Sequence, residues 1–324
     1  MSLTPKDIEA AAERIRGRAV RTPLLEAPAA SAAAGARILV KPEVLQRTGS
    51  FKFRGAMSRL SLLTADKRKR GVVAFSSGNH AQAVACAARD LGTSAVIVMP
   101  ADAPKLKIEN TRGYGADVVL YDRQREDRVA IGKKLASERG LTLVPPFDDY
   151  AVMAGQGTIG LELAEDARRI GTNIDAVLVP CSGGGLSAGI ATALATLSPA
   201  TKVYPVEPAN YDDMARSLKA GERLANAAGP LSICDALMVD KPGELTFPLL
   251  RARNAEALTV TDDEALRAMA HAFYELKLVA EPGGAAALAA LLAGKIDARG
   301  KTIAVILSGG NVDAEIFQRA LQKN

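Results

Sequence analysis

The sequence has little of the side-chain chemistry on which many enzymes and binding proteins depend. Its 324 residues include no tryptophan, two histidines and three cysteines, and aromatic residues make up 4% of the chain. So few aromatic rings argue against a stacking platform for single-stranded nucleic acid. With His80 and His271 as the two histidines, a site built from several imidazole groups is excluded.

Long hydrophobic runs and a strong charge of one sign are also missing. The longest apolar run, residues 285–293, is far shorter than the ~20 residues of a membrane span. The net charge of +5 is too small to suggest a concentrated basic face for nucleic acid. Cys86, Cys181 and Cys234 form no CxxC pair, so neither disulfides nor a zinc site are expected. These absences predict a cytoplasmic protein without membrane or nucleic-acid partners.

The sequence does have a regular alternation of short β-branched runs and alanine-rich stretches with helical spacing. The first helix is expected over residues 4–16, where Thr4 precedes Pro5 as a cap would. Nearly continuous apolar strands that alternate with helices predict an α/β fold, with a parallel sheet covered on both faces. The expected strands are residues 38–41, 72–75, 95–99, 118–121, 176–180, 202–206 and 303–307.

The length suggests about two domains, at roughly 150 residues per domain. Polar residues at 61–70 and the Pro145-Pro146 pair interrupt the pattern, and the segment between them has strand–helix units of its own. We therefore expect a small domain over residues 63–147, inserted into a larger domain made of residues 1–62 and 148–324.

The first of four glycine-containing turns, residues 48–55, contains Lys52. Ser50 is expected to cap the helix that follows, which places Lys52 in its first turn. The positive end of the helix dipole would then lower the pKa of Lys52, as an amine nucleophile requires. The alternative is a surface lysine at a helix start, which is more common for a position of this kind taken alone.

Two further turns provide groups that bind anions. Residues 76–80 (Ser-Ser-Gly-Asn-His) follow a strand and begin a helix, an arrangement suited to a carboxylate or phosphate. Residues 181–189 contain three adjacent glycines, which let the backbone close around a phosphate. An ordinary capped turn is the alternative for the former. For residues 181–189 the alternative is a dinucleotide-binding site, because Gly183 and Gly185 with Glu207 partly match its fingerprint. Gly189, however, falls one position late for the GxGxxG pattern.

The fourth turn, residues 307–311, places Ser308 at the carboxyl end of a strand, where ligands bind in open parallel sheets. A simple strand-to-helix connection is the alternative. Together the four turns supply a lysine, an anion site, a phosphate cradle and a hydroxyl group to one predicted cleft.

This combination resembles the fold type II pyridoxal-phosphate enzymes, in particular the serine racemase and threonine/serine dehydratase branch. The resemblance implies two open, mostly parallel twisted sheets with helices on both faces, like those of the tryptophan synthase β subunit, and a homodimer. The matching stretches follow the family's order and span most of the chain: residues 46–56, 76–84, 154–162, 182–189, 281–290 and 308–311.

The resemblance also implies how the chain binds pyridoxal phosphate. Lys52 would bind the cofactor covalently, Phe51 would pack against its ring, and Asn79 would hydrogen-bond its 3-hydroxyl group. Ser308 would face the pyridine nitrogen of the cofactor. A hydroxyl group keeps that nitrogen protonated less well than a carboxylate does, so the cofactor would be a weaker electron sink. The phosphate would lie beside Ser182 and accept from the backbone of Gly183, Gly184, Gly185 and Leu186.

For the substrate, the resemblance implies that the loop of Ser76, Ser77, Gly78, Asn79 and His80 holds the amino-acid carboxylate. Lys52 would remove the α-proton, and Ser77 would act on the opposite face.

Arg128 falls where serine racemases have an arginine that can meet a second carboxylate, with a helix-surface arginine as an equal alternative. Asp235-Ala236 departs from the Asp-Gly of many relatives, so the pocket wall differs there.

A divalent-cation site is implied as well. Glu207 and Asp213 would be its carboxylate ligands, together with the carbonyl of Tyr211. Hard oxygen ligands favour Mg²⁺, Mn²⁺ or Ca²⁺. The alternative is an acidic loop that caps the next helix.

These expectations describe an ammonia-lyase that converts serine, threonine or 3-hydroxyaspartate to a 2-keto acid and ammonia. One alternative is racemisation of serine or aspartate as the main activity, with Ser77 as the second acid/base. A less favoured one is an NAD-dependent oxidoreductase that uses residues 183–189 with Glu207. The last alternative is a binding subunit without catalytic activity. The presence of Lys52, Asn79 and Ser308 argues against it.

Overall fold

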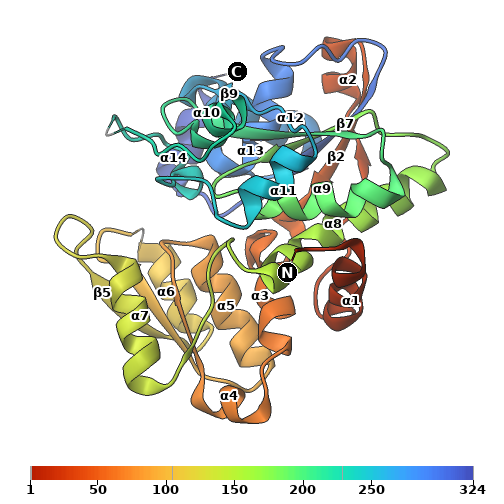
Figure 1. Cartoon of the computed structure of the whole chain (residues 1–324). Coiled ribbons are helices and arrows are strands. Elements are labelled where there is room, and N and C mark those ends of the chain that lie inside the picture. The colour runs from red at the N-terminus through yellow and green to blue at the C-terminus, as the bar shows by residue number, and fades with distance from the viewer. Residues whose placement is uncertain (1, 104, 228, 324) are drawn as a thin grey trace.

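The computed structural model describes residues 2–103, 105–227 and 229–323 and contains two separate sheets (Figure 1). Their strand orders are β1-β2-β10-β7-β8-β9 and β5-β4-β3-β6, and every pairing except β1 with β2 is parallel. The predicted α/β class with two mostly parallel sheets is therefore confirmed.

All seven predicted strands are present, as β2 (Arg37–Pro42), β3 (Val72–Phe75), β4 (Ala95–Pro100), β5 (Asp117–Tyr121), β7 (Ala176–Pro180), β8 (Lys202–Pro208) and β10 (Thr302–Leu307). Three strands were not predicted: β1 (Leu25–Glu26), β6 (Thr142–Leu143) and β9 (Leu258–Val260). Each is two or three residues long and lies at a sheet edge, so it carries too few residues for a recognisable pattern.

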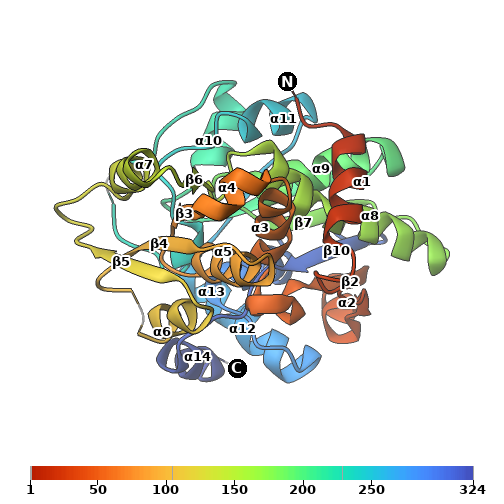
Figure 2. The ribbon, with the colours of Figure 1, turned by 90° about the horizontal axis from the view of Figure 1, so that it is seen from below.

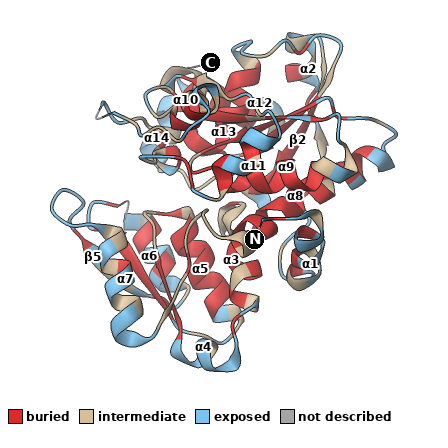
Figure 3. Cartoon of the chain, viewed as in Figure 1, coloured by how far each residue is buried: buried red, intermediate tan, exposed pale blue. Residues whose placement is uncertain are grey.

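Helices cover both faces of the six-stranded sheet because its central strands are apolar on both sides. Ala176 and Leu178 pack with one helical layer, while Val177 and Val179 pack with the other. One layer contains α2 (Pro28–Ala34), α12 (Asp262–Leu276), α13 (Pro282–Leu292) and α14 (Ala314–Leu321), and the other contains α1 (Pro5–Ile15), α8 (Tyr150–Arg169), α9 (Gly185–Leu197) and α11 (Thr246–Ala252). Buried residues accordingly run through the sheet and both layers (Figure 3).

Local signals place the ends of the first helix as expected. Thr4 caps α1, and its side chain and that of Asp7 form a reciprocal capping box. The helix predicted over residues 4–16 is confirmed to within one residue at each end.

The four-stranded sheet has α7 (Arg128–Arg139) on one face and α5 (Asn79–Asp90) with α6 (Lys105–Gly113) on the other (Figure 2). Helix α3 (Lys52–Ser61) packs on the latter side and also against α8. Helices α4 (Ala65–Arg70) and α10 (Asp213–Ala220) and the 3₁₀ turns η1 (Glu43–Leu45), η2 (Arg47–Gly49) and η3 (Asp235–Leu237) complete the structure.

The strands of the smaller sheet lie between residues 72 and 143, whereas the larger sheet takes strands from both ends of the chain. The domain boundaries at residues 62–63 and 147–148 stay a prediction. Within the described ranges, no helix is both long and apolar enough to cross a bilayer.

Candidate active site

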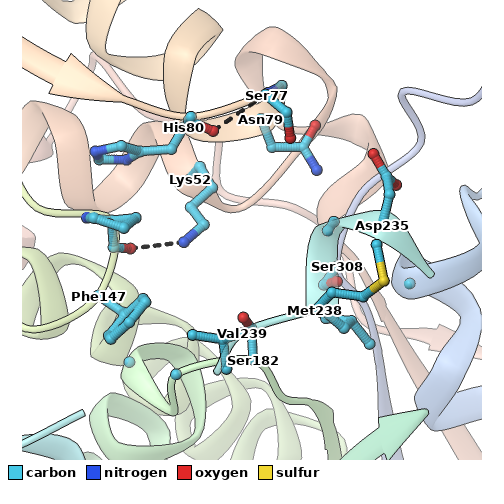
Figure 4. A pocket seen from close by; sticks show the side chains of 18 of the residues that line it. Lys52, Ser77, Asn79, His80, Phe147, Ser182, Asp235, Met238, Val239 and Ser308 are labelled. Carbon is cyan, nitrogen blue, oxygen red and sulfur yellow. Dashed lines mark hydrogen bonds between the residues drawn. The ribbon is translucent and has the colours of Figure 1, made fainter. Parts of the chain in front are cut away.

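A pocket lies between the two sheets, at the carboxyl ends of β3, β7 and β10 (Figure 4). It encloses about 960 Å³, including its open mouth. Parallel sheets bind ligands at this edge because the strand ends and the following helix starts meet there. The pocket is lined by every residue predicted for the cofactor or the substrate: Phe51, Lys52, Ser76, Ser77, Gly78, Asn79, His80, Arg128, Ser182, Gly183, Gly184, Gly185, Leu186 and Ser308.

Lys52 is the first residue of α3 and lies near the centre of the pocket (Figure 4). Its Nζ donates a hydrogen bond to the carbonyl oxygen of Pro146 at 2.6 Å and lies 5.1 Å from the centroid of the Phe51 ring. Burial of the amino group lowers the pKa of Lys52 to about 8. The shift has the predicted direction, and burial is its cause.

The predicted role of Ser50 is wrong. Phe51 occupies the N-cap position of α3, and Ser50 is extended and forms a bridge with Gly309. The Ser50 hydroxyl is buried and has no hydrogen-bond partner among the described residues. The contact with the β10 turn thus overrides the local capping preference.

The loop of residues 76–80 connects β3 to α5 and forms one wall of the pocket. Asn79 donates through Nδ2 to Oε1 of Glu281, and its Oδ1 accepts from Nδ2 of Asn311 at 2.7 Å. These two bonds fix the orientation of the amide and leave one hydrogen of Nδ2 for a further acceptor.

His80 does not point its Nε2 at a ligand. That atom lies 2.9 Å from the carbonyl oxygen of Val144. Burial, reinforced by the charge of Lys52, lowers the pKa of His80 to about 3. The imidazole is therefore neutral at physiological pH and contributes no positive charge to substrate binding.

The glycine turn after β7 forms the opposite wall. Gly184 is the N-cap of α9 and has a φ of +91°, a conformation that glycine adopts without strain. A Cβ atom at Gly183 would lie 2.3 Å from Cε2 of Phe147, and Oγ1 of Thr246 donates to the carbonyl of Gly183 at 2.5 Å. The turn is therefore held open by the absence of side chains, as a phosphate cradle at a helix start requires.

Ser308 follows the last residue of β10 and is 5% exposed. Its carbonyl accepts from the backbone of Phe51 at 3.0 Å, so the strand end holds the turn that carries Lys52. Arg128 begins α7 at the pocket rim, with its guanidinium carbon 5.9 Å from the centroid of the Phe75 ring.

Several pocket residues escaped the sequence prediction. Lys107 comes from α6 and Glu281 from the N-cap of α13, whereas Asp235 of η3 lies in the pocket wall, where the departure at Asp235-Ala236 was noted. Glu281 lies in a stretch that matched the family, which was a usable signal, whereas Lys107 lies in a polar helix without any motif. Burial raises the pKa of Glu281 to about 7, against the opposing charge of Lys107.

The predicted metal ligands lie outside the pocket lining. Both Glu207 oxygens accept backbone N–H groups at 2.9 Å, from Met214 and Ala215, so Glu207 caps α10. Asp213 accepts from Asn226 through Oδ1, while its buried Oδ2 lacks a partner in the described structure. No group of three His, Cys, Asp or Glu residues suited to a metal occurs within the described ranges.

The environment of these two carboxylates disfavours their charged forms. Burial raises the pKa of Asp213 to about 7, and burial together with the charge of Asp213 raises the pKa of Glu207 well above its usual value. Glu207 is fully buried, which removes it from the ribose-binding role of the dinucleotide alternative.

Comparison with known proteins places this pocket in a family. A protein of Pseudomonas sp. named L-threo-3-hydroxyaspartate ammonia-lyase is 45% identical over 316 residues, which are 98% of each chain. The serine racemase of Schizosaccharomyces pombe is 39% identical over 99% of this chain and 98% of its own. The crystal structure of the T.th. threonine deaminase superposes with a TM-score of 0.90, at 46% identity, over 96% of this chain and 99% of its own.

The predicted site residues fall within the segment that defines this family. The model of the pyridoxal-phosphate dependent enzymes matches residues 15–309. In the pocket, the open glycine turn suits the cofactor's phosphate group, and the amino group of Lys52 suits its aldehyde group. The chain therefore belongs to the family of pyridoxal-phosphate dependent enzymes.

Proposed function

We propose that the protein is a pyridoxal-phosphate dependent ammonia-lyase that eliminates water from a β-hydroxy amino acid and releases a 2-keto acid and ammonia. One observation carries the proposal. Lys52, whose pKa is lowered to about 8, lies in a single pocket with the anion-binding loop 76–80 and the glycine turn 183–185. The relatives named as ammonia-lyase and threonine deaminase support the same reaction.

The cofactor, when bound, supplies the electron sink that makes the α-proton of an amino acid acidic. We assign Lys52 to the transfer of that proton at Nζ, since burial favours its neutral form. The backbone and hydroxyl groups of residues 76–79 hold the substrate carboxylate. Phe51 and Phe147 line the pocket and exclude water from the reacting atoms.

A substrate panel tests the proposed reaction. The purified holoenzyme is assayed for keto acid and ammonia with L-serine, L-threonine and both diastereomers of L-3-hydroxyaspartate. We expect equimolar keto acid and ammonia from at least one of them. Holoenzyme that forms neither product from the whole panel would exclude the proposal.

We infer that L-threo-3-hydroxyaspartate is the preferred substrate. The inference is supported by the relatives of that name in Pseudomonas and Saccharomyces cerevisiae, at 45% and 43% identity. It is also supported by cationic side chains in the pocket besides Lys52, among them Arg128. A kcat/KM for L-serine or L-threonine above that for L-threo-3-hydroxyaspartate would contradict it.

Racemisation is the second candidate, because Ser77 lines the same pocket as Lys52 (Figure 4) and the chain is similar to a serine racemase. If Ser77 returns the proton to the opposite face, Ser77→Ala should reduce D-amino-acid formation by about 10²-fold or more. Keto-acid formation should fall much less, so the ratio of the two products, measured by chiral chromatography, changes. An unchanged ratio, or no D-product from the unmodified enzyme, argues against this activity.

We also propose that a divalent cation binds Asp213, Glu207 and the carbonyl of Tyr211. The unpartnered Oδ2 of Asp213 and the raised pKa values of both carboxylates support the proposal. The cation would screen two buried like charges, and oxygen ligands favour Mg²⁺, Mn²⁺ or Ca²⁺.

Removal of the cation should therefore destabilise the fold. At a hundredfold excess over its Kd, a bound ion contributes about 2.7 kcal/mol, or roughly 5 °C in Tm. We expect a chelator to lower the Tm by that amount and Mg²⁺, Mn²⁺ or Ca²⁺ to restore it. Asp213→Asn should make the Tm insensitive to both additions. Identical melting curves for the unmodified protein with and without chelator would contradict the cation site.

Gly183 gives a prediction for cofactor affinity. In Gly183→Ala the added Cβ would approach the Phe147 ring to 2.3 Å, and overpacking of this kind costs about 1–3 kcal/mol. The Kd of pyridoxal phosphate, measured by absorbance titration of the apoprotein, should rise about 5- to 150-fold.

Gly113→Ala is the matched control, because nothing lies within 4 Å of the added Cβ atom there, and its Kd should equal that of the unmodified protein. A Gly183→Ala variant with the same Kd would show that this turn does not hold the phosphate.

Assembly and location remain proposals of the same kind. We infer a cytoplasmic homodimer in which residues 63–147 close over the bound substrate. Three buried free thiols, Cys86, Cys181 and Cys234, are consistent with a reducing compartment. Light scattering of the purified protein at twice the monomer mass of 33.8 kDa would support the dimer.

A further inference from the structure

Lys107 is a buried cation in the pocket for which the proposed reaction has no use so far. It lies on α6, beside the four-stranded sheet, and is 7% exposed. Its Nζ pairs with Oδ2 of Asp235 at 3.1 Å, across the pocket from η3. A lysine buried to this extent needs a function or a partner that compensates for its desolvation.

The side chain of Lys107 lies against the loop proposed to hold the substrate carboxylate. A Cβ atom at Gly78 would be 2.9 Å from Cδ of Lys107 and 3.4 Å from its Nζ. The ammonium group therefore lies between this loop and Asp235 of η3, at the edge of the proposed substrate site. Arg128, the other candidate cation, is partly exposed at the rim and stacks over Phe75.

The ammonium group faces several acidic groups. Burial by itself would lower the pKa of Lys107, but the charges of Glu281, Asp235 and Asp313 outweigh burial, and the pKa is raised. Lys107 is thus charged at neutral pH and able to bind an anion.

Of these acidic partners, Asp235 can be exchanged most easily. Its side chain is 39% exposed, whereas Glu281 is buried and held by Asn79. Asp235 also belongs to the segment 235–239 that lines the pocket, so a ligand in the pocket can reach the pair.

We propose that Lys107 recognises the second carboxylate of a dicarboxylic substrate, and that this carboxylate takes the place of Asp235 at the ammonium group. The proposal rests on the proposed function and adds to it the residue that selects the substrate. A substrate without a second carboxylate leaves the Lys107–Asp235 pair intact. A dicarboxylic substrate exchanges one carboxylate for another, so no buried charge is left unpaired.

This exchange predicts opposite effects for the two members of the pair. Lys107→Gln removes the cation and should raise the KM for L-threo-3-hydroxyaspartate about 10- to 100-fold relative to the KM for L-serine. Asp235→Asn removes the competing anion and should lower the KM for L-threo-3-hydroxyaspartate about 3- to 10-fold relative to that for L-serine. Lys105→Gln, an exposed lysine on the same helix, is the control and should change neither value.

A binding measurement separates recognition from catalysis. Succinate and butyrate are titrated into the holoenzyme by calorimetry, since they differ in the second carboxylate. Lys107→Gln should weaken succinate binding at least 10-fold relative to butyrate, and Asp235→Asn should strengthen it. Arg128→Ala is measured alongside.

Each contrary result has a distinct meaning. Equal losses with both substrates and both ligands in Lys107→Gln would show that the lysine only joins the two sides of the pocket. Selective loss in Arg128→Ala with none in Lys107→Gln would assign recognition to Arg128. Either result overturns the inference and leaves the proposed reaction standing. If the unmodified holoenzyme turns over no substrate, the proposed reaction fails, and the succinate titration still decides whether Lys107 binds the second carboxylate.

Discussion

Lys52→Ala should abolish turnover and the visible absorbance of bound pyridoxal phosphate together. The variant loses the covalent link to the cofactor and also the group that moves the α-proton. Loss of a positioned base alone costs about 10²–10⁴-fold, so keto-acid formation is expected to fall by at least about 10⁴-fold. The measurement is a coupled keto-acid assay, with an absorbance spectrum of the same sample.

The matched control is Lys105→Ala, which replaces an exposed lysine outside the pocket lining. It should keep both the spectrum and the rate of the unmodified enzyme. Thermal melting of each variant shows that the protein is folded. A folded Lys52→Ala protein with a rate within tenfold of the unmodified enzyme would contradict the role of Lys52.

Arg54→Met should strongly destabilise the folded protein. Arg54 is 1% exposed and lies on α3, two residues after Lys52. Its guanidinium group donates to both oxygens of Glu43 at 2.8 Å and to both oxygens of Glu162, at 2.6 and 3.0 Å. The arginine thereby joins α3 to η1 and α8.

Removal of the arginine leaves Glu43, which is fully buried, without its main counter-charge. Breaking a buried ion pair from one side costs about 3–5 kcal/mol, which chemical denaturation measures as the free energy of unfolding. Arg16→Met, at an exposed pair with Glu13, should cost about 0–1 kcal/mol. A loss below about 1 kcal/mol in Arg54→Met would show that the network does not stabilise α3.

The sequence predicted those features that repeat or that concentrate in short segments. Runs of β-branched residues identified seven strands, because most strands of these sheets are buried on both faces and contain few polar residues. The turns around Lys52, residues 76–80, residues 183–185 and Ser308 were predicted because each combines unusual residues within a few positions. Their convergence in one pocket follows from the parallel topology.

Features that depend on contacts between distant segments were not predicted. Ser50 fails as a cap because Gly309, far along the chain, pairs with its backbone. Lys107 and Asp235 meet across 128 positions. Lys107 lies in no pattern that distinguishes it from a surface residue, and the comparison of Asp235-Ala236 with relatives does not indicate its ion pair. The pKa of Lys52 is likewise lowered by burial in the folded protein. The spacing of residues around Lys52 in the sequence does not predict that burial.

The central claim is that Lys52 holds pyridoxal phosphate in this pocket. Its most direct test is borohydride reduction of the holoenzyme, followed by digestion and mass spectrometry of the peptides. Reduction makes the bond between cofactor and lysine permanent, so the modified residue can be read from the peptide mass. We predict one pyridoxyl group per chain, attached to Lys52. A pyridoxyl group on Lys107, the other lysine that lines the pocket, or no specific modification at all, would contradict the claim.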